Sequence, residues 1–220
     1  MDILISGASR ALAAGDPLGA LNRVALRDDA PALALRGIAM AQLGDFVRAK
    51  TLLRRAAKAF GATDAVARAR CVAAEAEVAL ASRDLAWPEK SLAAARATLQ
   101  AHGDAVNAAH AAQLQARRQL LTGRPEDAGR TLDGVQIANL PAASRAIHEL
   151  IRGGIALRRV QASAASAALR RAADAARQAG IPALLAEVDH ACRALSAPAA
   201  RRVGQGGSCL LYTSPSPRDS

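Results

Sequence analysis

Aromatic residues make up only 2% of the 220 residues, namely Phe46, Phe60, Trp87 and Tyr212. Proteins that bind single-stranded nucleic acid stack bases on aromatic side chains, so this scarcity argues against a base-stacking surface. Strands also favour aromatic and β-branched residues, and no stretch alternates apolar and polar residues over the length of a strand. The sequence therefore excludes a β-rich fold.

Lysine occurs only three times, so the net charge of +10 comes from arginine. Arginine doublets occur in different predicted helices, at residues 54–55, 117–118, 158–159 and 170–171. Acidic residues are interspersed among them. Two interpretations stay open: arginine on solvated helix faces of a protein from a GC-rich genome, or a basic face for an anionic partner.

Cysteine is scarce as well, and Cys71, Cys192 and Cys209 form no Cys-x-x-Cys pair. No histidine lies four residues from another histidine or a cysteine, so the spacing of a zinc site is missing. No uncharged run reaches the ~18 residues that span a bilayer, and no basic leader precedes an apolar segment. We expect a bacterial, cytoplasmic protein that holds no metal and does not enter a membrane.

Motifs that carry enzyme chemistry are missing too. The sequence has no phosphate-binding glycine loop and no nucleophile elbow. Glu75 and Glu77 are two positions apart, which directs them to different faces of a helix rather than into one paired-carboxylate site. We therefore predict that this chain is not an enzyme and binds no cofactor.

Alanine and leucine supply most of the 51% hydrophobic residues, and both are strong helix formers. Aspartate and proline mark helix starts, as at Asp16-Pro17 and Asp45, and glycine marks helix ends, as at Gly44 and Gly61. This punctuation predicts an all-α chain of about eleven helices. The short links between them predict antiparallel hairpins.

Residues 36–49, Arg-Gly-Ile-Ala-Met-Ala-Gln-Leu-Gly-Asp-Phe-Val-Arg-Ala, resemble the core of a tetratricopeptide repeat, although Arg36 stands where that family usually has leucine. Gly37 and Ala49 are expected to face each other where two helices cross, because bulk there would push the axes apart. The pattern recurs, more faintly, at Ala95, Ala128, Gly153 and Ala165. The resemblance implies a solenoid of helical hairpins over residues 1–200, with packing positions at Gly37, Ala49, Ala128, Gly153 and Ala165.

In tetratricopeptide arrays the first helix of each hairpin lines a concave groove. Carried over to this chain, the resemblance places five side chains on that groove: Gln42, His110, Gln113, Arg117 and Arg158. A polar, partly cationic groove suits a protein segment or an acidic peptide, because arginine is a forked donor to carboxylates. The alternative is that these side chains are simply solvated.

The composition changes at the end of the chain, where serine, proline and tyrosine replace alanine. We expect a disordered tail over residues 201–220. Residues 209–219 resemble a translated sequencing adapter of the transposase type, so they are expected to be non-native. This interpretation implies that the natural protein continues past about Gly207.

Residues 34–61, 64–85 and 179–200 are similar to the N-terminal, repeat-containing half of bacterial winged-helix transcriptional regulators. The resemblance implies a sensor or interaction region, with DNA contacted only through a missing C-terminal domain. Two alternatives stay open. One is a stand-alone adaptor that gathers partner proteins, and the other is an enzyme whose catalytic domain lies downstream.

Overall fold

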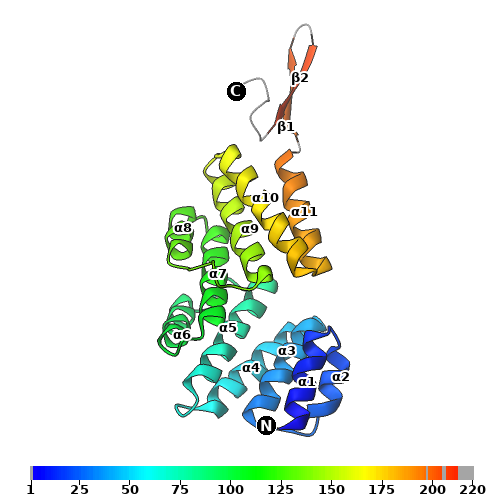
Figure 1. Ribbon diagram of the computed structural model, residues 1–220, viewed down its shortest axis with the longest axis vertical. Coiled ribbons are helices and arrows are strands. Elements are labelled where there is room, and N and C mark those ends of the chain that lie inside the picture. Colours follow the sequence, from blue (N-terminus) through cyan, green and yellow to red (C-terminus); the bar gives the residue numbers. More distant parts are fainter. Residues whose placement is uncertain (1, 197, 205–206, 213–220) are drawn as a thin grey trace. The chain divides into compact units, whose positions relative to one another are not determined.

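The computed structural model describes residues 2–196, 198–204 and 207–212 (Figure 1). The described residues form eleven helices: α1 Ile3–Ala13, α2 Pro17–Val24, α3 Ala30–Gln42, α4 Phe46–Phe60, α5 Ala65–Ala81, α6 Glu89–Ala101, α7 Ala105–Leu121, α8 Pro125–Asp133, α9 Ala142–Arg158, α10 Ala162–Ala179 and α11 Pro182–Ser196. The prediction of an all-α chain is confirmed for residues 2–196.

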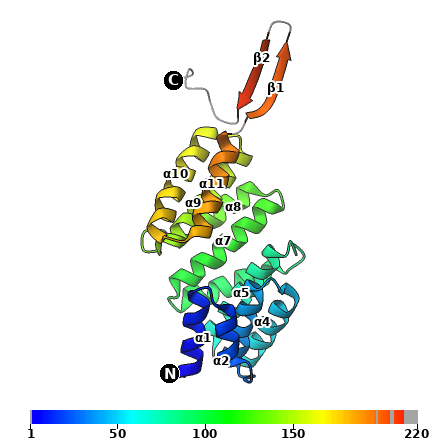
Figure 2. The ribbon, with the colours of Figure 1, turned by 90° about the vertical axis from the view of Figure 1, so that its right-hand side faces the viewer.

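The chain divides into two compact units, Met1–Gln115 (unit 1) and Ala116–Ser220 (unit 2), and the division falls within α7. In unit 1, α1 packs on α2, α3 on α4 and α5 on α6, and α3 also contacts α1 and α5. In unit 2, α9 packs on α8, α10 and α11 (Figure 2). Within each unit, consecutive helices thus form hairpins, as the short links predict.

Aspartate side chains cap the helix starts at the predicted positions. The Oδ1 atoms of Asp16, Asp45 and Asp64 accept hydrogen bonds from main-chain N–H groups three residues on, at 2.8, 3.1 and 2.9 Å. Each bond satisfies a donor that the helix itself leaves unpaired. These caps fix where α2, α4 and α5 begin.

Six links share one turn in which a main-chain N–H donates to the carbonyl five residues back. The donor–acceptor pairs are Asp16–Ala11, Asp45–Met40, Asp84–Ala79, Asp104–Leu99, Arg124–Gln119 and Gln161–Ala156, at 2.8–2.9 Å. The residue before each donor has a positive φ, which is characteristic of this helix ending. Glycine takes that place in four turns, whereas Arg83 and Val160 take it in the other two.

Replacing Val160 by glycine is expected to stabilise unit 2 by about 1 kcal/mol, because a left-handed backbone costs an L-residue roughly 1–2 kcal/mol. Val160 has a φ of 58° and a 90% exposed side chain, so little packing would be lost. The reverse change, Gly123→Val at an equivalent turn with a φ of 74°, should destabilise the same unit. Thermal unfolding of both variants checks the prediction, and shifts of the same sign would contradict it.

Small residues allow the helices to cross closely within the hairpins. A Cβ atom at Gly37 would lie 2.8 Å from Leu53 Cγ and 3.3 Å from the Ala49 carbonyl oxygen. A Cβ atom at Gly153 would lie 2.9 Å from Leu169 Cδ2. Neither glycine therefore has room for a side chain unless the facing leucine moves.

The same spacing recurs in four hairpins: a small residue, a buried alanine twelve positions on, and a buried aliphatic residue four positions further. The four sets are Ala8–Ala20–Val24, Gly37–Ala49–Leu53, Ala116–Ala128–Leu132 and Gly153–Ala165–Leu169. All twelve residues are buried. The Ala8 set does not stand out in the sequence, because alanine occurs at so many other positions.

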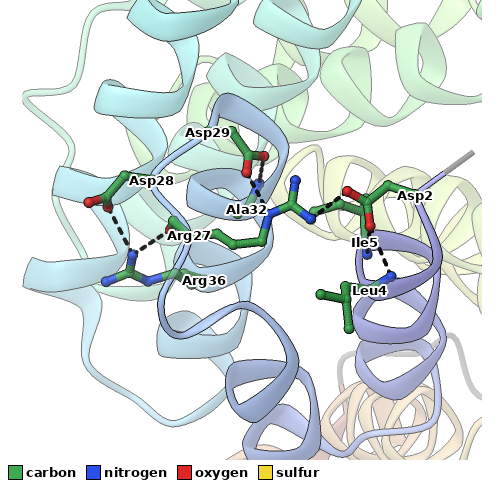
Figure 3. A network of polar contacts seen from close by, with 8 residues as sticks. All are labelled: Asp2, Leu4, Ile5, Arg27, Asp28, Asp29, Ala32 and Arg36. Atoms are coloured by element: carbon green, nitrogen blue, oxygen red, sulfur yellow. Dashed lines mark hydrogen bonds and ion pairs between the residues drawn. The ribbon is translucent and has the colours of Figure 1, made fainter.

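One arginine joins the N-terminal caps of α1 and α3. The Arg27 guanidinium contacts Asp2, which caps α1, and lies 2.6 Å from Asp29, which caps α3 (Figure 3). These contacts hold the pKa of both carboxyl groups below its ordinary value. Arg36 donates to the Arg27 carbonyl oxygen at 3.0 Å and to Asp28 at 3.1 Å, so it anchors the link before α3. That contact gives Arg36 a structural role in this link.

After α11 the backbone forms two antiparallel strands, β1 (Pro198–Gly204) and β2 (Gly207–Tyr212), with Gly204 paired to Gly207. The sequence predicts a disordered tail over residues 201–220, so this pairing is a difference from the expectation. Of the leucine and tyrosine residues in β2, only Tyr212 belongs to the types that strands favour, so the sequence gives little indication of this pairing. The adapter origin of residues 209–219 stays a prediction.

Candidate functional site

The five predicted groove residues fall in both units. Gln42, His110 and Gln113 belong to unit 1, and Arg117 and Arg158 belong to unit 2.

Gln42 lines a cavity of about 290 Å³ in unit 1, formed by α3, α4 and α5. The lining residues are Ile38, Ala41, Gln42, Phe46, Leu53, Ala74, Glu77, Val78 and Ala81. Most of them are apolar. The Gln42 amide donates to the Leu12 carbonyl oxygen at 3.3 Å, which fixes its side chain against the end of α1.

The edge of this cavity is polar and acidic. Gln42, Glu77 and Ala81 are exposed, and His110 Nε2 lies 3.3 Å from Glu77 Oε2. Gln42 and His110 are therefore both associated with one cavity, Gln42 directly and His110 through Glu77. Gln113 is only 1% exposed, so a ligand in an open groove would not reach it.

The two arginines predicted for the groove already have partners. Arg117 Nη2 lies 2.7 Å from Glu187 Oε1, and about two fifths of each side chain is exposed, at 43% and 44%. An ion pair this exposed contributes little stability, so its exchange for another carboxylate costs little. Arg158 is exposed, and its Nη1 donates to the Gly154 carbonyl oxygen at 3.1 Å within its own helix.

A buried acid that the sequence did not mark as special lies in unit 1. Glu75 is 8% exposed, and its Oε1 accepts hydrogen bonds from Arg54 Nε at 2.7 Å and from Trp87 Nε1 at 3.0 Å. Glu77 points outward, as the two-residue offset predicts. The pairing with Trp87 holds the long link between α5 and α6 against the core. The signal that could have found it is the chain's one tryptophan, placed in that link.

Among the residues that the structure describes, no three or more His, Cys, Asp or Glu side chains gather as a metal site would require. Within the same part of the chain, no helix has the length and apolar run needed to cross a bilayer. Cys71 is buried, and burial raises the pKa of its thiol to about 11, with Asp64 adding to the effect. Its thiolate fraction near neutral pH is therefore small.

Sequence reasoning also missed a larger cavity in unit 2, lined by α8, α9 and α10 and holding four arginines. In the sequence these arginines are scattered over 42 positions, so only the folded hairpins bring them together. Comparisons of this chain with protein-family models, with curated proteins and with solved structures found no match.

Proposed function

We propose that this chain is a non-enzymatic helical-repeat region that binds a segment of a partner protein. The observation that carries the proposal is the repeated hairpin, with Gly37–Ala49–Leu53 in unit 1 and Gly153–Ala165–Leu169 in unit 2 at identical spacing. Stacked hairpins of this kind present extended surfaces that hold partners.

Polar contacts support the same repeat. Several of them join residues 33 or 34 positions apart, which is the length of one tetratricopeptide unit. The pairs are Lys50–Asp84, Arg70–Asp104, Glu77–His110, Glu126–Arg159 and Arg145–Gln178. These contacts join helices at about one repeat length, which supports a tetratricopeptide-like stack.

The unit 1 cavity is the proposed binding site. Its apolar lining suits one aliphatic or aromatic side chain of the partner, and the exposed Gln42 and Glu77 can hydrogen-bond the adjoining main chain. The partner class is therefore a protein segment with an apolar anchor. Arg117 and Arg158, on which the expectation of an acidic peptide rests, belong to unit 2 and are not part of this site.

Selection of a random peptide library on the immobilised protein, followed by fluorescence polarisation of a recovered peptide, tests the proposal. The recovered peptides should share an apolar residue. Ala81→Trp, at the exposed edge of the cavity, should weaken their binding by at least about tenfold, since loss of an anchor contact costs more than 1 kcal/mol.

Ala59→Trp is the matched control, because Ala59 is exposed on α4 and does not line the cavity. It should bind the peptide as the parent protein does. A library that yields no common apolar residue, or equal weakening by the two tryptophans, would refute the binding site.

The wider role that we propose is the sensor or interaction region of a bacterial transcriptional regulator, with a stand-alone adaptor as the alternative. The resemblance of residues 34–61, 64–85 and 179–200 supports the first. The gene sequence that follows the codon of about Gly207 in the source genome distinguishes the two roles. A basic helix-turn-helix with a wing favours the regulator, and an immediate stop codon favours the adaptor.

A further inference from the structure

A cavity of about 550 Å³ lies in unit 2, between α8 and α10 and over one side of α9. Its charged lining consists of Arg130, Arg152, Arg159, Arg171, Glu126 and Asp133. The arginines of the lining outnumber its acids by four to two. Arg130, Arg152 and Arg171 lie on α8, α9 and α10, and Arg159 directly follows α9. The volume falls within the range of about 300–1,000 Å³ that small-molecule sites occupy.

Each of the four guanidinium groups is held in place by a carboxylate, and Arg130 contacts Asp127. Arg152 lies 2.6 Å from Asp133, Arg159 lies 2.9 Å from Glu126, and Arg171 lies 2.8 Å from Glu149. A guanidinium carries five N–H donors, so one carboxylate partner leaves others for a ligand. Because these ion pairs already restrict the arginine side chains, the side chains lose less conformational entropy when a ligand binds.

The layer beneath two of the arginines is buried. Glu149 is 7% exposed, and its pairing raises the pKa of Arg171. His148 is 2% exposed, and burial, together with the nearby Arg152, lowers its pKa, so the ring is neutral near pH 7. Its Nε2 therefore accepts the hydrogen bond from Arg152 Nε, at 3.2 Å. The buried His148 ring and the buried Glu149 carboxylate thus orient the guanidinium groups of Arg152 and Arg171.

Most of the remaining lining is apolar. It includes Leu132, Ile155, Ala156, Ala164 and Ala168 from the same three helices, and Gln161 adds one uncharged polar side chain. A ligand here would meet forked cationic donors on one part of its surface and aliphatic groups on another. Arginine forks match the geometry of carboxylate and phosphate oxygens.

We propose that this cavity binds a small organic anion, a carboxylate or phosphate ester joined to an apolar body. The inference is independent of the segment-binding site, because the two cavities share no residue. It gives the chain a ligand-sensing site in unit 2 in addition to a partner site in unit 1.

Titration calorimetry of the full chain with phenyl phosphate and with benzoate tests the proposal, and the two probes distinguish the phosphate from the carboxylate source. At least one should bind more tightly than inorganic phosphate, which lacks the apolar body, and than benzyl alcohol, which lacks the anion. The double variant Arg159→Gln/Arg171→Gln should weaken binding by at least about tenfold, because it removes charge-assisted hydrogen bonds to the anion.

Two other arginines of unit 2 provide a matched control. Arg170→Gln/Arg177→Gln removes the same charge from this unit, yet neither residue lines the cavity. This variant should bind the probe within about twofold of the parent, an effect of long-range charge alone. Equal weakening by both double variants would show non-specific attraction and overturn the site. Absence of binding by both probes would overturn it as well.

Discussion

Trp87→Ala is expected to lower the free energy of unfolding of unit 1 by about 3–5 kcal/mol, the usual cost of removing a buried aromatic side chain. Trp87 is 6% exposed and packs in a cluster with Leu92, Leu99 and the alanines of α5. Its removal would also take one of two hydrogen-bond donors from the buried carboxylate of Glu75. Both the lost packing and the lost hydrogen bond would weaken the attachment of the link between α5 and α6 to the core.

Urea unfolding followed by circular dichroism measures the effect, since the only tryptophan is absent from the variant. Trp87→Phe separates the two contributions, because it keeps most of the buried ring and removes the N–H donor. We expect Trp87→Phe to lose about 1.5–3 kcal/mol, the contribution of one hydrogen bond to a charged group, because Glu75 then keeps only the bond from Arg54. If both variants unfold like the parent, Trp87 does not hold the link to the core.

The helix boundaries could be predicted because their signals are local. Asp45 caps α4 through its own neighbour three residues on, and Gly44 ends the preceding helix with a positive φ. Neither interaction depends on the rest of the fold. Val160 shows the limit of this reasoning, since a β-branched residue takes the same left-handed turn where the surrounding hairpin requires it.

Side-chain partners could not be predicted to the same extent, because they depend on how helices pack. Gln113 has the sequence character of a surface residue, yet it is 1% exposed. Glu75 pairs with Arg54, 21 positions away and on the preceding helix. Helical periodicity gives the face on which a residue lies but not the distance to the neighbouring element.

The candidate sites also differ in how far the sequence indicates them. The repeat resemblance places Gln42 on the groove, and Gln42 does line a cavity. No sequence pattern indicates the arginine-lined cavity. Arg130 and Arg171 line one cavity only because α8 and α10 flank the same side of α9, and no local sequence pattern encodes that arrangement. The sequence therefore indicates the repeat more fully than the surfaces that the repeat builds.

Gly153→Ala is expected to destabilise unit 2 relative to Gly154→Ala by about 1–3 kcal/mol, the cost of overpacking a buried contact. The added Cβ at residue 153 would lie 2.9 Å from Leu169 Cδ2 and 3.0 Å from its Cγ, and Leu169 is 2% exposed. At residue 154 the nearest atom, Leu120 Cδ1, lies 3.5 Å away, which is an ordinary contact. The helix-forming advantage of alanine over glycine is common to both variants, so their difference isolates the crowding.

Gly37→Ala extends the test to unit 1, since its Cβ would lie 2.8 Å from Leu53 Cγ. If the two hairpins are copies of one repeat, Gly37→Ala and Gly153→Ala should be destabilising by similar amounts, while Gly154→Ala should be neutral or stabilising. Urea unfolding of the three variants decides the matter. A Gly153→Ala protein as stable as Gly154→Ala would mean that Leu169 moves aside at no cost. Close crossing at a small residue would then not be what joins the hairpins, and the proposed repeat would lose its main support.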